Sequence, residues 1–107
     1  MNIIDKILKH AAVLCLQEVH GTEAELKKIF NKYKNTHTLH YTFLDASAGG
    51  NVTLIRFNAF PKGAVFPDPV VLATGRAITS EVILSDNSHN QCHISILNIH
   101  NESIEDT

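Results

Sequence analysis

The sequence predicts an α/β protein of the α+β type, in which two helices are followed by a run of mainly antiparallel strands. Apolar residues recur at helical spacing near the start of the chain and at alternate positions after Asn35. Prolines and glycines separate the later apolar segments, as they do between strands. The 107 residues, of which 44% are hydrophobic, are enough to bury one core without disulfides or a metal.

Two helices and an intervening strand are expected in the first part of the chain. The first helix is short and amphipathic, and the apolar run 12–16 after it is typical of a central strand covered on both faces. A second helix is expected from Thr22, because Glu25 stands at the capping-box spacing. The apolar positions of the two helices are Ile3, Ile4, Ile7, Leu8 and Ala11, then Leu26, Ile29, Phe30 and Tyr33. The lysines of the second helix are interpreted as a solvated face rather than a phosphate-binding patch.

The rest of the chain predicts strands at 39–43, 52–57 and 76–84, with a short strand at 70–72 and a last one at 92–100. The proline-rich segment 60–69 is a connection or a sheet edge. In the last strand, apolar residues lie on both faces, so an interior position is expected. One face carries Cys92, Ile94, Ile96, Asn98 and His100, and the other carries His93, Ser95, Leu97 and Ile99.

Composition narrows the classes of partner and the compartment. A formal net charge of -2 provides no overall attraction to nucleic acid or anionic lipid, so a polyanion contact would need a local arrangement of charge. Cys15 and Cys92 each lie in an apolar run, which favours reduced thiols in an intracellular protein and no disulfide partner. No apolar stretch approaches the ~20 residues that span a bilayer, so no membrane partner is expected. An intracellular location is predicted, with the nucleus left open.

Glu18 is the strongest candidate for chemistry among the polar residues. It follows the apolar strand and precedes Gly21 and the cap of the second helix. A carboxylate at the carboxyl end of a buried strand is where open sheets place ligand-facing groups. Together with a phosphate substrate, one or two such carboxylates can hold Mg²⁺. The alternative interpretation is a glutamate that merely ends a strand at the surface.

Other reaction centres are not favoured. The residues His89, Cys92, His93 and His100 do not predict a zinc site, because strand alternation places His93 and His100 on opposite faces. A paired Cys-x-x-Cys motif is also missing from the sequence. A serine hydrolase is not indicated either, since the sequence contains no Gly-x-Ser-x-Gly motif.

A set of short motifs in a fixed order resembles the endonuclease/exonuclease/phosphatase superfamily. Val13–Gly21 is similar to that family's apolar strand ending in Leu-Gln-Glu before a histidine. Gly49–Val52 and Gly75-Arg76 resemble the openings of later strands, and Ile96–Asn101 resembles the strand with Asn-x-Tyr or Asn-x-His. The superfamily includes apurinic endonucleases like exonuclease III and enzymes like DNase I. Within the superfamily, the sequence most resembles the endonuclease domains of non-LTR retrotransposons.

The resemblance implies a four-layered α/β sandwich of the DNase I-like type that hydrolyses phosphoester bonds with Mg²⁺ or Mn²⁺. Glu18 would be the metal-binding carboxylate, and His100 would stand where the family has a Tyr or His that contacts the phosphate. Asn98 and Asn101 would contact the phosphate or orient neighbouring groups. Nucleic acid, with DNA the expected substrate, would be the partner of the complete domain. An equally favoured alternative is that His100 is a buried histidine at the end of the strand, hydrogen-bonded to the backbone.

The sequence departs from the family pattern in ways that limit this expectation. The family's first strand and the Gly-Asp-x-Asn and Ser-Asp-His motifs of its second half are missing, so residues 1–107 are interpreted as a single incomplete domain. Ser85–His89 resembles the closing motif but lies in a predicted turn, and we reject that match. Without a general base the chain is expected to be inactive alone. A half-sandwich should also expose an apolar sheet edge or face that the missing half would cover. The alternative is a small non-catalytic α+β binding or scaffold domain, in which Glu18 and His100 share no site.

Overall fold

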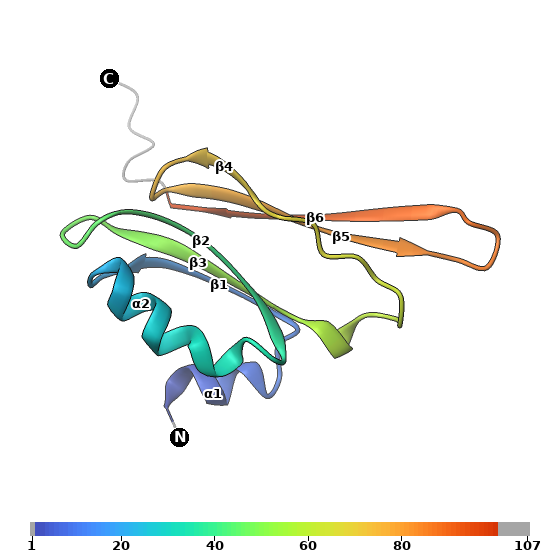
Figure 1. Cartoon of the computed structure of the whole chain (residues 1–107), viewed down its shortest axis with the longest axis horizontal. Coiled ribbons are helices and arrows are strands. Elements are labelled where there is room, and N and C mark those ends of the chain that lie inside the picture. The colour runs from blue at the N-terminus through green and yellow to red at the C-terminus, as the bar shows by residue number, and fades with distance from the viewer. Residues whose placement is uncertain (1, 101–107) are drawn as a thin grey trace.

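A computed structural model describes residues 2–100 and shows two helices and two three-stranded antiparallel sheets (Figure 1). The first sheet has the order β1-β3-β2 and the second has the order β4-β5-β6. The helices are α1 (Ile3–Leu8) and α2 (Glu23–Phe30). The strands are β1 (Val13–Val19), β2 (His37–Asp45), β3 (Gly49–Arg56), β4 (Val70–Ala73), β5 (Ala77–Ser85) and β6 (Gln91–Ile99). The predicted α+β class is therefore confirmed.

Both helices begin at residues whose side chains cap them. The Asn2 side chain accepts from the Asp5 amide at 2.8 Å at the start of α1. Thr22 and Glu25 form the predicted capping box of α2, with both reciprocal bonds at 3.1 Å. Such caps satisfy backbone N–H groups that the first turn leaves without partners. The first helix ends at Leu8, earlier than its apolar spacing suggests.

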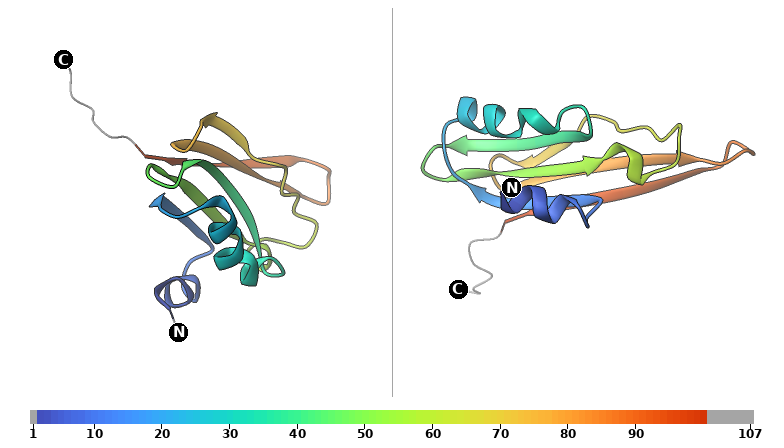
Figure 2. Two further views of the ribbon diagram at one scale, coloured as in Figure 1. Left: turned by 60° about the vertical axis from the view of Figure 1, so that its left-hand side comes forward. Right: turned by 90° about the horizontal axis from the view of Figure 1, so that it is seen from below.

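The helices cover one face of the first sheet, and the second sheet packs on the other face (Figures 1 and 2). A buried cluster joins the helices to β3. Asp5 links the helical segments, because its carboxylate accepts from the Tyr33 hydroxyl at 2.6 Å and from Lys32 at 3.0 Å. The cluster comprises Leu8, Leu26, Phe30, Tyr33, Val52 and Leu54. The described residues thus form three layers, of helices, first sheet and second sheet.

The interface between the two sheets is partly polar. Its apolar part contains Ile55, Ile78 and Val82, each with 0% of its surface exposed. The His40 Nδ1 atom lies 2.7 Å from the Ser80 hydroxyl and so links β2 to β5. Buried polar groups of this kind must find partners inside the protein, and their geometry therefore restricts how the sheets can align.

Two expectations about strand position are wrong for the described residues. Both β1 and β6 are edge strands of their sheets, whereas an interior position was expected for each. Side chains on the outer face of β6 are about half exposed, with Leu97 at 54% and Ile99 at 51%. An apolar residue pattern indicates that the faces of a strand can be buried, but it does not show whether a second strand pairs with its other edge.

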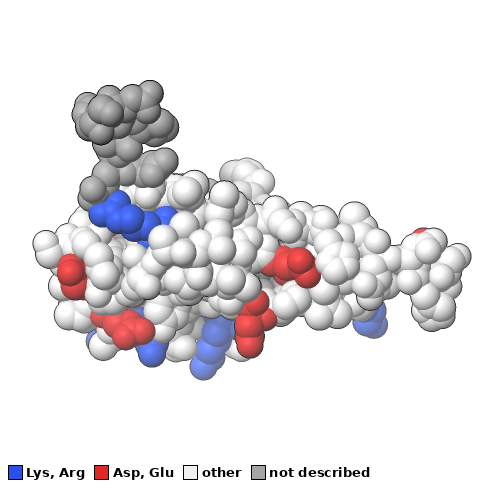
Figure 3. All heavy atoms as spheres, turned by 90° about the horizontal axis from the view of Figure 1, so that it is seen from above, with Lys and Arg blue, Asp and Glu red and all other residues white. Residues whose placement is uncertain are grey.

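The outer face of the second sheet is uncovered in the part of the chain described. All four residues of β4 are exposed, and this face also carries Leu97 and Ile99 of β6. Seen from this side, most of the surface has no charged side chains (Figure 3). The second sheet thus exposes an apolar outer face, as predicted. Neither α1 nor α2 is long or apolar enough to cross a membrane, and Cys15 and Cys92 are both free thiols.

Candidate functional site

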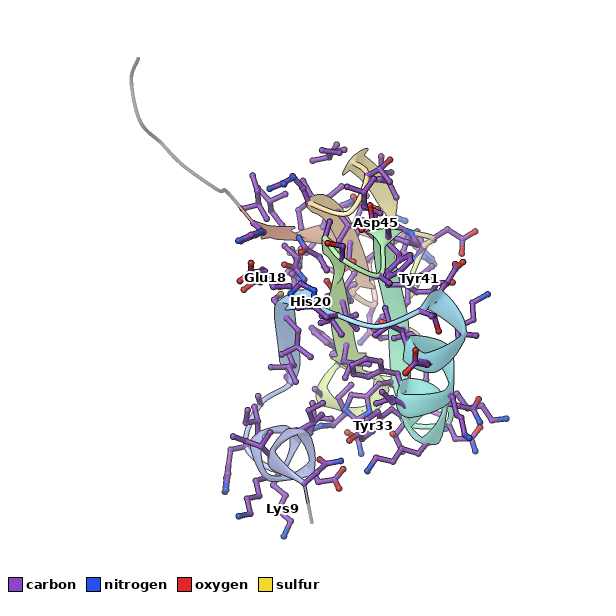
Figure 4. The ribbon with its side chains drawn as sticks, turned by 90° about the vertical axis from the view of Figure 1, so that its left-hand side faces the viewer. Lys9, Glu18, His20, Tyr33, Tyr41 and Asp45 are labelled. Carbon is purple, nitrogen blue, oxygen red and sulfur yellow. The ribbon has the colours of Figure 1, made fainter. Side chains whose placement is uncertain are left out.

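The ends of the two sheets enclose a small polar pocket, which we call the Glu18 pocket. Its volume is about 160 Å³. Each part of its wall comes from a segment at the end of a strand, so the pocket depends on how the two sheets align. The lining residues are Glu18, His20, Leu44, Ser47, Ala48, Gly75, Arg76 and His100. Figure 4 shows Glu18 and His20 next to each other at this end of the molecule.

Glu18 lies in a β-bulge and has a strained backbone. The pairing of β1 with β3 is regular up to Leu16 and resumes at Val19, which leaves Gln17 and Glu18 outside the ladder. The φ of Glu18 is 53°, in the left-handed region that residues other than glycine rarely adopt. Its side chain is 62% exposed. Bulges of this kind redirect side chains and occur frequently beside active sites, and backbone strain at one residue is a further mark of such sites.

His100 faces Glu18 from the second sheet. Its Nε2 atom lies 3.9 Å from Oε1 of Glu18, and its side chain is 27% exposed. The backbone N–H of His100 donates to the Arg76 carbonyl at 2.8 Å, which holds the residue beside the β4–β5 turn. The structure therefore brings the two predicted catalytic residues together. The contact is an ion pair when the imidazole is protonated.

Two glycines allow the hairpins around the pocket to approach one another. Gly49 and Gly75 both have a φ of 75°, which favours glycine. A Cβ at Gly49 would lie 2.7 Å from the Val19 carbonyl oxygen, and one at Gly75 would lie 2.6 Å from the Leu44 Cβ. Any other residue at these positions would push the walls of the pocket apart.

His20 and Arg76 line the pocket but were not predicted as site residues. Both stand inside the short sequence motifs described above, His20 directly after Leu-Gln-Glu-Val and Arg76 directly after Gly75. Their role depends on the approach of the hairpins, which the motifs alone do not reveal. With them the pocket contains one carboxylate, one guanidinium and two imidazoles. This set can bind an anion directly and a cation through the carboxylate.

Asn98 lies behind the pocket rather than in it. It is 1% exposed, and among residues 2–100 its side-chain amide bonds to groups of the first sheet. The position suits the predicted orienting role and does not suit direct contact with a phosphate. Asn101, the other predicted phosphate-contacting or orienting residue, lies outside the described residues.

Among the described residues that line the pocket, Glu18 is the one carboxylate that could hold a cation. Within residues 2–100, no three His, Cys, Asp or Glu side chains are placed to hold one ion together. Asp45 is engaged elsewhere, because its carboxylate accepts from the Ala48 amide at 2.6 Å. His93 pairs with Glu81 at 3.2 Å, so His93 and His100 have different partners.

No family model, curated protein or solved structure matches this chain. The chemistry of the pocket therefore has to follow from its own residues. A carboxylate oxygen can bind a divalent cation, and imidazoles and a guanidinium can donate hydrogen bonds to an anion such as phosphate.

Proposed function

We propose that the Glu18 pocket is the cation- and phosphate-binding part of a phosphoester-hydrolysing site of the nuclease type. The observation that carries this proposal is the 3.9 Å approach of Glu18 and His100. These residues lie far apart in the sequence and belong to different sheets. Convergence of polar side chains from distant segments in one pocket is a criterion for recognising a candidate functional site.

The chemistry of the donors fits a magnesium or manganese ion. Mg²⁺ keeps several of its waters and commonly binds through one or two carboxylates together with a substrate phosphate. Glu18, with an exposed carboxylate, is the residue that would hold the ion. When bound, Mg²⁺ or Mn²⁺ would polarise a phosphoryl oxygen and offset the negative charge that develops there.

The remaining groups of the pocket suit the phosphate itself. The His100 imidazole lies beside the Glu18 carboxylate, so it can donate a hydrogen bond to a phosphate oxygen next to the ion. A guanidinium such as that of Arg76 can bind two phosphate oxygens at once. His20, which lies next to Glu18 in Figure 4 and also lines the pocket, adds a further donor.

We expect this chain to bind without turning over substrate. Hydrolysis needs a group that activates water, and the described lining of the pocket offers no acidic side chain besides Glu18. The three observed layers are compatible with part of the four-layered sandwich that the motifs imply. In that arrangement a further helical layer would cover the outer face of the second sheet, where Leu97 and Ile99 are exposed.

Binding of a short fluorescein-labelled DNA duplex, followed by anisotropy with and without Mn²⁺, tests the proposal. Mn²⁺ should strengthen binding to the unaltered chain, because Glu18 would hold the ion and its positive charge would attract a phosphate. In Glu18→Gln the effect of Mn²⁺ should be lost. Binding in EDTA should become equal or tighter, because the substitution removes a negative charge beside the phosphate. The substitution should thus weaken binding in Mn²⁺ but not in EDTA. This difference distinguishes a carboxylate that holds the ion from one that only repels DNA.

Glu81→Gln is the matched control. Glu81 also faces a histidine, His93, at 3.2 Å, but it lies on the β5–β6 hairpin outside the Glu18 pocket. This variant should keep the full effect of Mn²⁺. If Glu18→Gln and the unaltered chain respond to Mn²⁺ alike, the proposal is wrong. The uncovered apolar face would then favour the alternative of a non-catalytic binding or scaffold domain.

A further inference from the structure

The buried side chain of Asn98 connects the two sheets directly behind the Glu18 pocket. Its Nδ2 donates toward the Leu16 carbonyl at 3.2 Å, the Val52 carbonyl at 3.0 Å and the Thr53 hydroxyl at 3.1 Å. Its Oδ1 accepts from Nε2 of Gln17 at 2.7 Å. One residue of β6 thereby bonds to both β1 and β3.

The contacts to Leu16 and Gln17 fall at the start of the bulge that carries Glu18. Gln17 and Glu18 make no ladder pairing with β3, so the backbone there is held mainly at Leu16 and Val19. A non-glycine residue with positive φ persists only where its surroundings enforce that conformation. The hydrogen bonds from Asn98 to Leu16 and Gln17 help to hold Glu18 in this conformation.

Asn98 is also close to the other half of the pocket. It precedes His100 by two positions on the same segment, and its own carbonyl accepts from Nδ2 of Asn51 at 3.3 Å. The same Asn51 amide donates to the Arg76 carbonyl at 2.6 Å, and that carbonyl also accepts from the His100 amide. The two asparagines thus bind the ends of β1, β3, β5 and β6 into one network.

We propose that Asn98 is the positioning residue of the Glu18 pocket, which sets the separation of the Glu18 carboxylate and the His100 imidazole. The metal-binding consequence rests on the proposed function, whereas the geometric claim does not. Asn98 acts through Gln17 and Leu16 on one side and along β6 on the other, and it touches no ligand.

The chemistry of this position requires an amide. Carbonyl oxygens only accept, so the group that faces Leu16 and Val52 must donate, while the group that faces the Gln17 amide must accept. An aspartate would lose both donors and place a charge between the sheets. An alanine would leave two carbonyls, a hydroxyl and the Gln17 amide without this partner.

Two independent readouts test the proposal in the full chain. The first is the NOE between the His100 ring and the Glu18 side chain, which needs no metal. The second is the Mn²⁺ affinity of the pocket, measured by paramagnetic line broadening. In Asn98→Ala the NOE should disappear and the affinity should fall about tenfold or more, as when outer groups that position metal ligands are removed.

Ser80→Ala is the matched control, because it also removes a buried inter-sheet contact, the one to His40, further along β5. It should lower stability while leaving the NOE and the Mn²⁺ affinity unchanged. Gln17→Ala, a change at an exposed residue, should weaken both signals even if Asn98→Ala fails to fold.

The positioning role is overturned if Asn98→Ala keeps the NOE and the affinity, or, where that variant does not fold, if Gln17→Ala keeps them. Failure of the proposed function would look different. The unaltered chain would then show the NOE but no Mn²⁺ broadening at the pocket, and loss of the NOE in the variants would still support the role of Asn98.

Discussion

At the scale of single residues, Glu18 combines an unfavourable backbone conformation with the position that the proposed chemistry needs. Its φ of 53° would suit glycine better than any residue with a Cβ. Evolution commonly retains such strain where a side chain has a role, and replacing the residue then raises stability at the expense of function. Substitutions at Glu18 can separate the effect of the strained backbone on stability from the effect of the carboxylate on binding.

Glu18→Gly should be more stable than Glu18→Ala by about 1 kcal/mol, because only glycine adopts positive φ without cost. At Lys28, an exposed position within α2, the alanine variant should instead be more stable than the glycine variant by about 1 kcal/mol. Urea unfolding of the four variants measures both differences. Equal stability of the two Glu18 variants would show that the left-handed conformation is not present in solution.

His40 and His37 make the stability of the fold dependent on pH. Burial lowers the pKa of His40 below its ordinary value of 6.5, although the Asp68 carboxylate opposes the shift. Burial, with a smaller contribution from the Arg56 charge, lowers the pKa of His37 in the same direction. The unfolded chain therefore binds more protons than the folded one just below pH 6.5, so these residues favour folding above that pH and lose the effect as the pH falls.

We expect the free energy of unfolding to decrease between about pH 7 and about pH 5, the range in which histidines titrate. The decrease should be smaller in His40→Asn, which keeps a polar group opposite Ser80 but does not titrate. Urea unfolding at several pH values measures the slope. An unchanged slope in His40→Asn would contradict the buried position of this imidazole.

At the scale of elements, several features were predictable because their signals are local. The capping residues Thr22 and Glu25 mark the start of α2, and alternation of apolar residues marks β2. The edge positions of β1 and β6 were not predictable, because a residue pattern does not reveal how many neighbours a strand has.

The candidate site was predictable in part for the same reason. Glu18 could be identified from its place after an apolar run, and His100 from its motif. The pocket residues His20 and Arg76 could not be assigned, since they come close together only when the ends of several strands pack around one space. The sequence motif also left two roles open for Asn98, and only its burial distinguishes them.

The turn between β4 and β5 forms part of this closure and can be tested. Gly75→Ala should destabilise the protein by about 1–3 kcal/mol, because it adds both positive-φ strain and a clash with Leu44. Gly63 also has a positive φ, 94°, but a Cβ there would meet nothing within 4 Å. Gly63→Ala should therefore cost only about 1 kcal/mol.

Thermal unfolding of the two alanine variants gives the comparison. The difference between them measures the steric part of the effect at Gly75. Amide chemical shifts at Leu44 and His100 should change in Gly75→Ala and stay unchanged in Gly63→Ala. Equal destabilisation of both variants would indicate that the β4–β5 turn does not pack against β2 as described.

At the scale of the whole molecule, the Glu18 pocket depends on the alignment of two sheets that meet through a partly polar interface. The helices bury one face of the first sheet, and the second sheet buries the other. The outer face of the second sheet is uncovered among residues 2–100, and it is apolar where Leu97 and Ile99 lie. The alignment brings Glu18 and His100, one from each sheet, into a single pocket.

The most direct test of this account is the site of Mn²⁺ binding, mapped by line broadening of amide signals with inorganic phosphate present. Broadening should centre on Glu18 and His100, vanish in Glu18→Gln and persist in Glu81→Gln. Broadening centred instead on the exposed pair of Glu81 and His93, or equal broadening in Glu18→Gln and the unaltered chain, would contradict a cation site in the Glu18 pocket.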